Sequence, residues 1–303
     1  MNITEITIPS SDGIHQLRTK IYTPDTEPIG IFGVVHGMTE HIDRYDRFMS
    51  DMCKCGYVVF GSDNLGHGKS VRDDSELGFI SHENGWDHLC RDVAIVSEHV
   101  KRGYPSLPFS LLGHSMGSFI VRLTAEKYVT PDKLIIMGTG GPNPLAGIGI
   151  VLAKLIKATK GERHISRFID NMAFGSYNDR FKEDGAQGWL TSDASVREKY
   201  ASDKYCTFKF TISAMLDLLI LCKSANDKVW FKNVSAKKIP ILLTSGEDDP
   251  VGDYGKGVLR VYELLGEQNA DVTLKLYKNY RHEILNDTSY DAVVADIKDF
   301  CRR

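Results

Sequence analysis

The stretch LLGHSMGSF, residues 111–119, places one serine between two glycines where an apolar run gives way to a helical pattern. The preceding FSLL (109–112) is typical of a buried strand, so GHSMG matches the G-x-S-x-G motif in its strand–turn–helix context. Gly113 and Gly117 let neighbouring backbone approach without a Cβ clash. A turn this tight exposes the serine oxygen at the helix N-terminus, and we therefore predict that Ser115 is a nucleophile.

Short apolar runs alternate with helical patterns on both sides of this turn. Most of the runs lack two-residue alternation, which is typical of strands covered on both faces. The runs are IGIFGVV (29–35), YVVF (57–60), FSLL (109–112), LIIM (134–137), IPILL (239–243) and VTLKLY (272–277). Strands that alternate with helices predict an α/β protein with a mostly parallel sheet.

Two further segments depart from this alternation of strands and helices. Near the N-terminus, ITEITI and the alternating residues 17–21 flank the turn SSDG and predict an antiparallel edge pair, with Arg18 and Lys20 on the exposed side. Between about 140 and 235 no strand pattern appears, and this interval is too long for a loop. We predict an α/β core formed by residues 1–139 and 236–303, with a helical cap inserted at 140–235.

A nucleophilic serine needs a base and an acid that orients the base. His282 lies in the loop after the last predicted strand, where such a base belongs, whereas His15 and His99 are expected to face solvent. The acid is expected in TSGEDDP, after the run 239–243. Asp249 is preferred because it precedes a proline that keeps it extended, and Asp248 is its main rival.

The negative charge that develops during acyl transfer needs fixed backbone donors. The N–H of Met116, the residue after the serine, and the N–H of Met38, in the loop HGMTEH (36–41), are the candidates. We expect His36 and His41 to hold this loop in place. No H-E-x-x-H motif is present, so a metal site is not predicted. A serine that acts with a histidine and an aspartate requires no organic cofactor, and none is predicted.

The composition narrows the classes of partner and compartment. The 303 residues carry a formal net charge of −3, which does not suit a nucleic-acid partner. The chain shows no signal peptide and no apolar run of about 20 residues, and its six cysteines do not form a disulfide framework. We expect free thiols and a cytoplasmic location, with peripheral membrane contact through the apolar cap as an option.

Together the motifs resemble the α/β-hydrolase fold, and more narrowly the monoacylglycerol lipase and lysophospholipase-like serine hydrolases. The resemblance runs from about residue 10 to the C-terminus and rests on HGMTEH (36–41), DNLGHGKS (63–70), GHSMG (113–117), GEDD (246–249) and YRHE (280–283). It implies an eight-stranded, mostly parallel sheet flanked by helices, with an inserted helical cap. One departure is Thr39, where the family often has glycine; its side chain could narrow the acyl entrance.

The resemblance implies hydrolysis of carboxylic esters, of the monoacylglycerol or lysophospholipid type, through an acyl-serine intermediate. The substrate is then a small ester or lipid, and the oligomeric state stays open. Two alternatives remain: an aminopeptidase or amidase that uses the same triad, and a non-catalytic binding protein of this fold. Labelling of Ser115 by a fluorophosphonate separates the last from the enzymes.

Overall fold

A single sheet of eight strands forms the centre of the computed structural model, which describes residues 1–303. The strands are β1 (Asn2–Pro9), β2 (Gln16–Thr23), β3 (Gly30–Val35), β4 (Tyr57–Ser62), β5 (Phe109–His114), β6 (Lys133–Met137), β7 (Ile241–Gly246) and β8 (Val272–Tyr277). Their order is β1-β2-β4-β3-β5-β6-β7-β8. β2 is antiparallel to both of its neighbours and all other pairs are parallel. The predicted fold class is confirmed.

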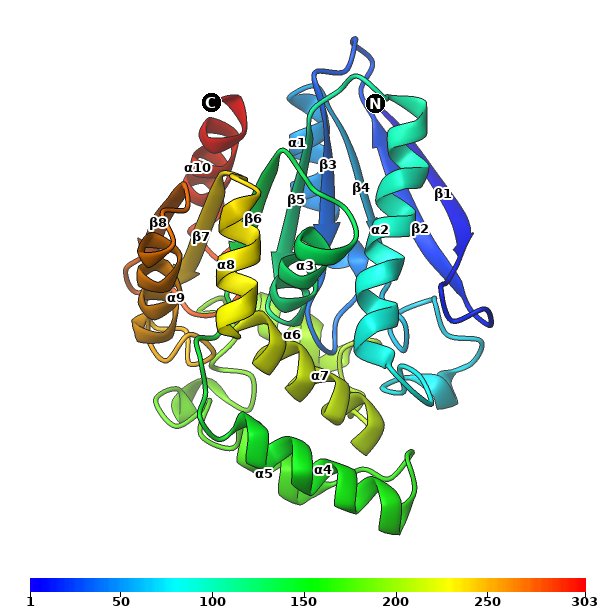
Figure 1. Ribbon diagram of the computed structural model, residues 1–303, viewed down its shortest axis with the longest axis vertical. Coiled ribbons are helices and arrows are strands. Elements are labelled where there is room, and N and C mark those ends of the chain that lie inside the picture. The colour runs from blue at the N-terminus through cyan, green and yellow to red at the C-terminus, as the bar shows by residue number, and fades with distance from the viewer.

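Helices cover both faces of this sheet (Figure 1). One face carries α2 (Gly85–Gly103), α3 (Met116–Lys127), α8 (Lys228–Ala236) and α9 (Lys256–Glu267). The other carries α1 (Asp46–Lys54) and α10 (Tyr290–Arg302). Each face has its own apolar core. On β3, Ile31 and Val35 belong to one core, and Phe32 and Val34 to the other. This division explains why the central strands are apolar throughout.

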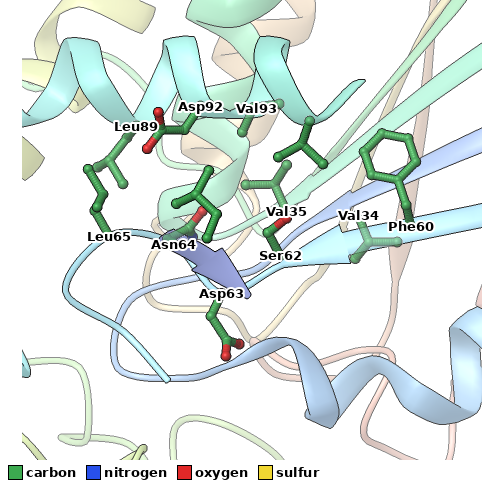
Figure 2. Close-up of a pocket in the computed structure, with 12 residues that line it drawn as sticks. Val34, Val35, Phe60, Ser62, Asp63, Asn64, Leu65, Leu89, Asp92 and Val93 are labelled. Carbon is green, nitrogen blue, oxygen red and sulfur yellow. The ribbon is translucent and has the colours of Figure 1, made fainter. Parts of the chain in front are cut away.

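A small gap remains in the core between β3, β4 and α2 (Figure 2). Its volume is about 20 Å³, room for a single water, and its walls include Val35, Phe60 and Leu89. Beside it, the Asp92 carboxylate of α2 accepts hydrogen bonds from the Ser10 hydroxyl (2.8 Å) and the Ser11 N–H (2.6 Å). The gap is therefore a packing feature under the turn between β1 and β2.

The expectation that Arg18 and Lys20 face solvent is wrong. Both residues are buried, with relative exposures of 5% and 8%. Arg18 bonds Asp43 at 2.8 Å, and Lys20 bonds Asp43 at 3.0 Å and Asp46 at 2.5 Å. The segment that follows β3 folds over this face of β2 and supplies the carboxylates, which the two-residue alternation alone does not reveal. His15 is also not free in solvent, because Asp12 lies 2.5 Å from its Nδ1.

Between β6 and β7 the chain contains helices and no strand. In order they are α4 (Ala146–Lys160), α5 (Arg167–Phe174), α6 (Ala194–Ser202), α7 (Ile212–Ala225) and α8. α4 packs on α7, and α7 packs on α2 and α3. α4 and α5 lie farthest from the sheet (Figure 1), whereas α8 packs on α3 and α9. The division into core and cap at 140–235 stays a prediction. No helix has the length and apolarity needed to cross a bilayer.

Candidate active site

Ser115 occupies a forced turn between β5 and α3. Its backbone has φ +53° and ψ −120°, a region that non-glycine residues rarely adopt and that costs about 1–3 kcal/mol. The Ser115 N–H donates to the Met137 carbonyl of β6 at 3.0 Å. Its own carbonyl accepts from the Ser118 N–H and hydroxyl, at 2.9 and 2.5 Å. Neighbouring elements therefore hold the strained residue in place.

The two flanking glycines make this turn possible. A Cβ on Gly117 would collide with the carbonyl oxygen of Val35, and a Cβ on Gly113 would collide with the carbonyl oxygen of Gly117. The helix that starts after Ser115 can therefore sit directly against the end of β3. This contact aims the serine into the cavity beyond the carboxyl ends of the strands, where open α/β sheets bind ligands.

His282 lies in the loop between β8 and α10, at the same edge of the sheet. Its Nδ1 is 2.9 Å from Oδ2 of Asp249, and both side chains are buried. Asp249 also accepts from the Ser245 hydroxyl at 3.1 Å and from the Val251 N–H at 2.9 Å. Its rival Asp248 makes no such contact with the imidazole. The structure therefore pairs His282 with the preferred carboxylate.

Ser115 and His282 line one cavity of about 420 Å³. No hydrogen bond joins the Ser115 hydroxyl to the imidazole, and Nε2 of His282 has no partner within the protein. In unliganded enzymes the hydrogen bond between nucleophile and base is often long and tightens with substrate. Nε2 is thus free for the serine proton.

Aromatic and backbone contacts hold the His282 loop. The imidazole packs against the rings of His114 and Trp189, with centroid distances of 4.6 and 5.2 Å. Nε2 of His114 lies 3.2 Å from the His282 carbonyl oxygen, which accepts the hydrogen bond. The Glu283 N–H donates to the Leu190 carbonyl at 2.8 Å. The helical segment between β6 and β7 therefore supports the histidine loop directly.

The loop HGMTEH crosses beside the nucleophile. A Cβ on Gly37 would lie 2.9 Å from the Ser115 Cβ, and the Gly37 N–H donates to the Glu40 carboxylate at 2.5 Å. Met38 and Met116 both line the cavity. Neither of their N–H groups donates a hydrogen bond inside the protein. Both are consequently free to hold an oxyanion, which is how we interpret them.

A buried charge network lies behind this loop. Glu40 accepts from the Tyr45 hydroxyl at 2.9 Å and lies 3.2 Å from Nδ1 of His114. Arg44 donates to Glu40 at 2.9 Å and to both oxygens of Glu283 at 2.7 and 2.6 Å. The network thus joins the loop after β3, the residue before the serine and the residue after His282.

The protonation of this network follows from its contacts. Burial opposes the charge of Glu40, but the hydrogen bond from His114 and the charge of Arg44 outweigh it and hold the pKa of Glu40 well below its usual value. Burial likewise lowers the pKa of His114, but the hydrogen bond and charge of Glu40 prevail and raise it. Glu40 is therefore ionised, and its charge is compensated inside the protein.

The remaining histidines of the motifs have structural contacts. Nε2 of His36 accepts from the Asn64 N–H at 2.9 Å, and burial lowers the pKa of His36 to about 4. Nδ1 of His67 donates to the Leu65 carbonyl at 2.8 Å, and burial lowers the pKa of His67 to about 3. Both imidazoles are consequently neutral at pH 7 and anchor their loops.

The donor atoms of His41, Asp203 and Cys206 lie within 4.8 Å of one another, the one set of three that could hold a metal ion. His41 is already hydrogen-bonded to Asp203 at 2.9 Å. Burial raises the pKa of the Cys206 thiol, and the side-chain hydrogen bond that joins members of this set is the one between the His41 imidazole and the Asp203 carboxylate. We interpret the set as an imidazole–carboxylate pair that holds the loop.

Several residues around the site escaped sequence reasoning. Trp189, Leu190 and Tyr200 come from the segment between β6 and β7, where no strand end or motif marks them. Arg44 stands four residues after Glu40, a spacing that suits an ion pair, but its second partner Glu283 is 239 positions away. Only the fold brings these side chains together.

Comparison with known proteins places the chain among hydrolases. Residues 26–289 match the family described as serine aminopeptidase, S33. A monoacylglycerol lipase of Mycolicibacterium smegmatis is 26% identical over 91% of this chain and 89% of its own length. Human monoglyceride lipase is 27% identical over 90% of this chain and 81% of its own length. The structure of a thermostable carboxyl esterase from Bacillus coagulans, in complex with glycerol, matches with a TM-score of 0.93 at 29% identity, over 100% of this chain and 98% of that chain.

Proposed function

The chain belongs to the family described as serine aminopeptidase, S33, and on that premise we propose that it is a serine hydrolase cleaving carboxylic esters of small lipids through Ser115. The observation that carries the proposal is the cavity itself. It is lined by a serine on a strained turn and by an imidazole whose other nitrogen is bonded to a buried carboxylate. The lipase and esterase relatives support the same reaction class.

The first half of the reaction forms the acyl-enzyme. Nε2 of His282 takes the proton of the Ser115 hydroxyl as the serine oxygen attacks the ester carbonyl carbon. Asp249, bonded to Nδ1, fixes the tautomer and stabilises the imidazolium. The N–H groups of Met38 and Met116 bind the oxyanion as it develops. The C–O bond to the alcohol then breaks, and His282 donates the proton to the leaving oxygen.

The second half returns the free enzyme. Water takes the place of the alcohol and gives its proton to His282 as it attacks the acyl carbon. The same two N–H groups hold the second oxyanion, and the acyl–oxygen bond to Ser115 breaks as the imidazole returns the proton. Each step uses only residues of this chain, water and the ester.

The cavity supports an apolar acyl group as the substrate's main recognised part. Its volume of about 420 Å³ suits a small lipid, and 14 of its 27 lining residues are hydrophobic. They include Phe119, Phe174 and Leu218. We propose a monoacylglycerol or lysophospholipid because the relatives include monoacylglycerol lipases. Thr39 lines the cavity, and we propose that its side chain narrows the acyl entrance.

The charges beside the serine favour an ester over a peptide with a free amino terminus. An aminopeptidase needs a carboxylate free to bind the substrate ammonium group. Glu40 and Glu283 line the cavity, but Arg44 is bonded to both. The third lining carboxylate, Asp170, lies 3.6 Å from Lys209. Since each has a cationic partner, we place amide cleavage second.

We also propose that the insertion rests on a lipid surface. α4 and α5 expose apolar side chains at helical spacing on the part of the molecule farthest from the sheet (Figure 1). They are Ile148, Val151, Leu155, Phe168 and Met172, and the exposed Leu145 directly precedes α4. Lys154 and Lys160 are exposed on α4 and suit anionic headgroups. A cytoplasmic location, peripheral to a membrane, remains part of this proposal.

Vesicle flotation tests the surface. Wild-type protein is expected to float with vesicles of phosphatidylcholine and phosphatidylglycerol, and Leu155→Asp with Phe168→Asp is expected to stay at the bottom. Leu259→Asp, which changes an exposed leucine on α9, is the matched control. Equal flotation of the double variant and the control would contradict this role of α4 and α5.

A panel of esters tests the reaction. p-Nitrophenyl esters of increasing chain length, a monoacylglycerol, lysophosphatidylcholine and an aminoacyl amide are supplied to wild type and to Ser115→Ala. Because the triad acts as a unit, we expect the variant to lose about 10⁶-fold in kcat on esters. Retention of a tenth of wild-type turnover, or failure of a fluorophosphonate to label Ser115, would overturn the proposal.

A further inference from the structure

Thr39 is the second strained residue of the site. Its φ is +50°, in the left-handed region that a β-branched side chain rarely enters. It is the third residue of the turn from Gly37 to Glu40, where turns with positive φ favour glycine. The Glu40 carboxylate reaches back to the Gly37 N–H across this turn. The backbone conformation of Thr39 therefore determines the shape of the turn that contains the Met38 N–H.

A tyrosine from the insertion holds Thr39 in this conformation. The Tyr200 hydroxyl of α6 lies 3.0 Å from the Thr39 carbonyl oxygen and 2.8 Å from its Oγ1. A phenol has one proton, so when it donates to the carbonyl it accepts from the threonine hydroxyl. Burial raises the pKa of Tyr200, which keeps that proton in place. Two hydrogen bonds thus fasten one strained residue.

The same segment contacts the loop a second time. Asp203, three residues after Tyr200, bonds Nε2 of His41 at 2.9 Å. The Arg44 guanidinium lies 5.0 Å from the centre of the Tyr200 ring. A hydrogen bond and a cation–π contact therefore hold the segment around Tyr200 against the loop that carries Thr39.

We propose that Tyr200 is a positioning residue for the oxyanion site: it holds Thr39 in the left-handed conformation that aims the Met38 N–H at the reacting carbonyl. The inference rests on the proposed ester hydrolysis. In this chain the insertion completes the oxyanion site, and a threonine occupies a position suited to glycine because Tyr200 stabilises it there.

The test is a double-mutant cycle between Tyr200→Phe and Thr39→Gly. Tyr200→Phe is expected to lower kcat about tenfold, with KM changed less than about twofold, because the oxyanion develops only in the transition state. Binding of a trifluoromethyl ketone analogue of the ester, which presents an oxyanion, is expected to weaken by a similar factor. Glycine adopts positive φ unaided, so in the Thr39→Gly background the same change is expected to cost less than about threefold.

Tyr205→Phe is the matched control, because its hydroxyl makes no bond to the loop, and Ser115→Ala run alongside reports separately on the proposed reaction. If circular dichroism shows that Tyr200→Phe does not fold, Thr39→Val is tested in its place. This change removes the hydrogen bond between Oγ1 and the Tyr200 hydroxyl and keeps a β-branched residue at positive φ. The proposal is overturned if Tyr200→Phe retains kcat within twofold of wild type. It is also overturned if its effect is unchanged in the Thr39→Gly background, which would indicate that the tyrosine binds substrate directly.

Discussion

Replacement of Arg44 by methionine tests the buried network behind the site. The Arg44 side chain is 12% exposed, and its partners Glu40 and Glu283 are 4% and 3% exposed. Methionine keeps much of the packing but removes three charged hydrogen bonds. Glu40 retains Gly37, Tyr45 and His114 as partners, whereas Glu283 keeps only the Asn286 amide at 3.3 Å. The Glu283 carboxylate becomes a buried charge with one weak partner.

The expected cost is about 3–5 kcal/mol, as for other buried pairs that lose one member. At about 2.1 cal/mol/K of unfolding entropy per residue, 303 residues give about 0.6 kcal/mol/K. Arg44→Met should therefore lower Tm by about 5–8 °C in differential scanning calorimetry. Adding Glu283→Gln should recover part of the loss, because a neutral amide is less costly to bury than a lone carboxylate.

Arg260→Met is the control. Arg260 forms exposed ion pairs with Glu263 and Glu267 on α9, and such pairs contribute about 0–1 kcal/mol. A Tm for Arg44→Met within 1 °C of this control would refute the assignment of a buried network. Simple addition of the Arg44 and Glu283 effects would refute their coupling.

Further predictions concern the triad, the buried histidines and the cavity. Asp249→Asn should lower kcat about 10⁴-fold because it stabilises the wrong tautomer of the imidazole, whereas Asp248→Asn should stay within twofold; ester kinetics decide. Burial lowers the pKa of His67 from 6.5 to about 3. As pH falls below about 6.5, the unfolded chain binds this proton before the folded chain does, so the free energy of unfolding decreases between about pH 6.5 and pH 3. Urea unfolding at pH 7 and pH 5 should show a smaller loss for His67→Phe than for wild type. Leu218→Trp should shift the preferred p-nitrophenyl ester to shorter chains, and an unchanged profile would exclude Leu218 from the acyl wall.

The parts of the site that could be predicted are those that local sequence specifies. Ser115 lies in a five-residue motif, and His282 and Asp249 follow strands whose apolar runs are visible. Parallel strands bring their carboxyl ends to one edge of the sheet, so position after a strand was enough to group these residues. The same reasoning identified the loop that contains Met38.

Residues joined by distant packing could not be predicted. Arg18 and Lys20 alternate with apolar neighbours as in a half-exposed strand, yet Asp43 and Asp46, from a segment more than 20 positions away, bury them. Tyr200 is half-buried and lies in α6, a helix with no fully buried residue and no clear apolar face. Its role depends on a loop 161 positions earlier in the chain. The periodicity of a segment indicates which of its side chains share a face. It does not indicate which distant segment packs on that face.

The backbone carbonyl of Leu190 accepts from the residue beside His282, and Asp287 of the histidine loop accepts from the Thr191 hydroxyl at 2.7 Å and the Ser192 N–H at 2.9 Å. A chimaera that exchanged the whole interval between β6 and β7 for that of a relative would lose these hydrogen bonds. It would also lose the residues of this interval that line the cavity. Engineers who wish to change chain-length preference would do better to graft only α4 and α5. Residues 188–206, which contact the His282 loop and Thr39, should then be kept.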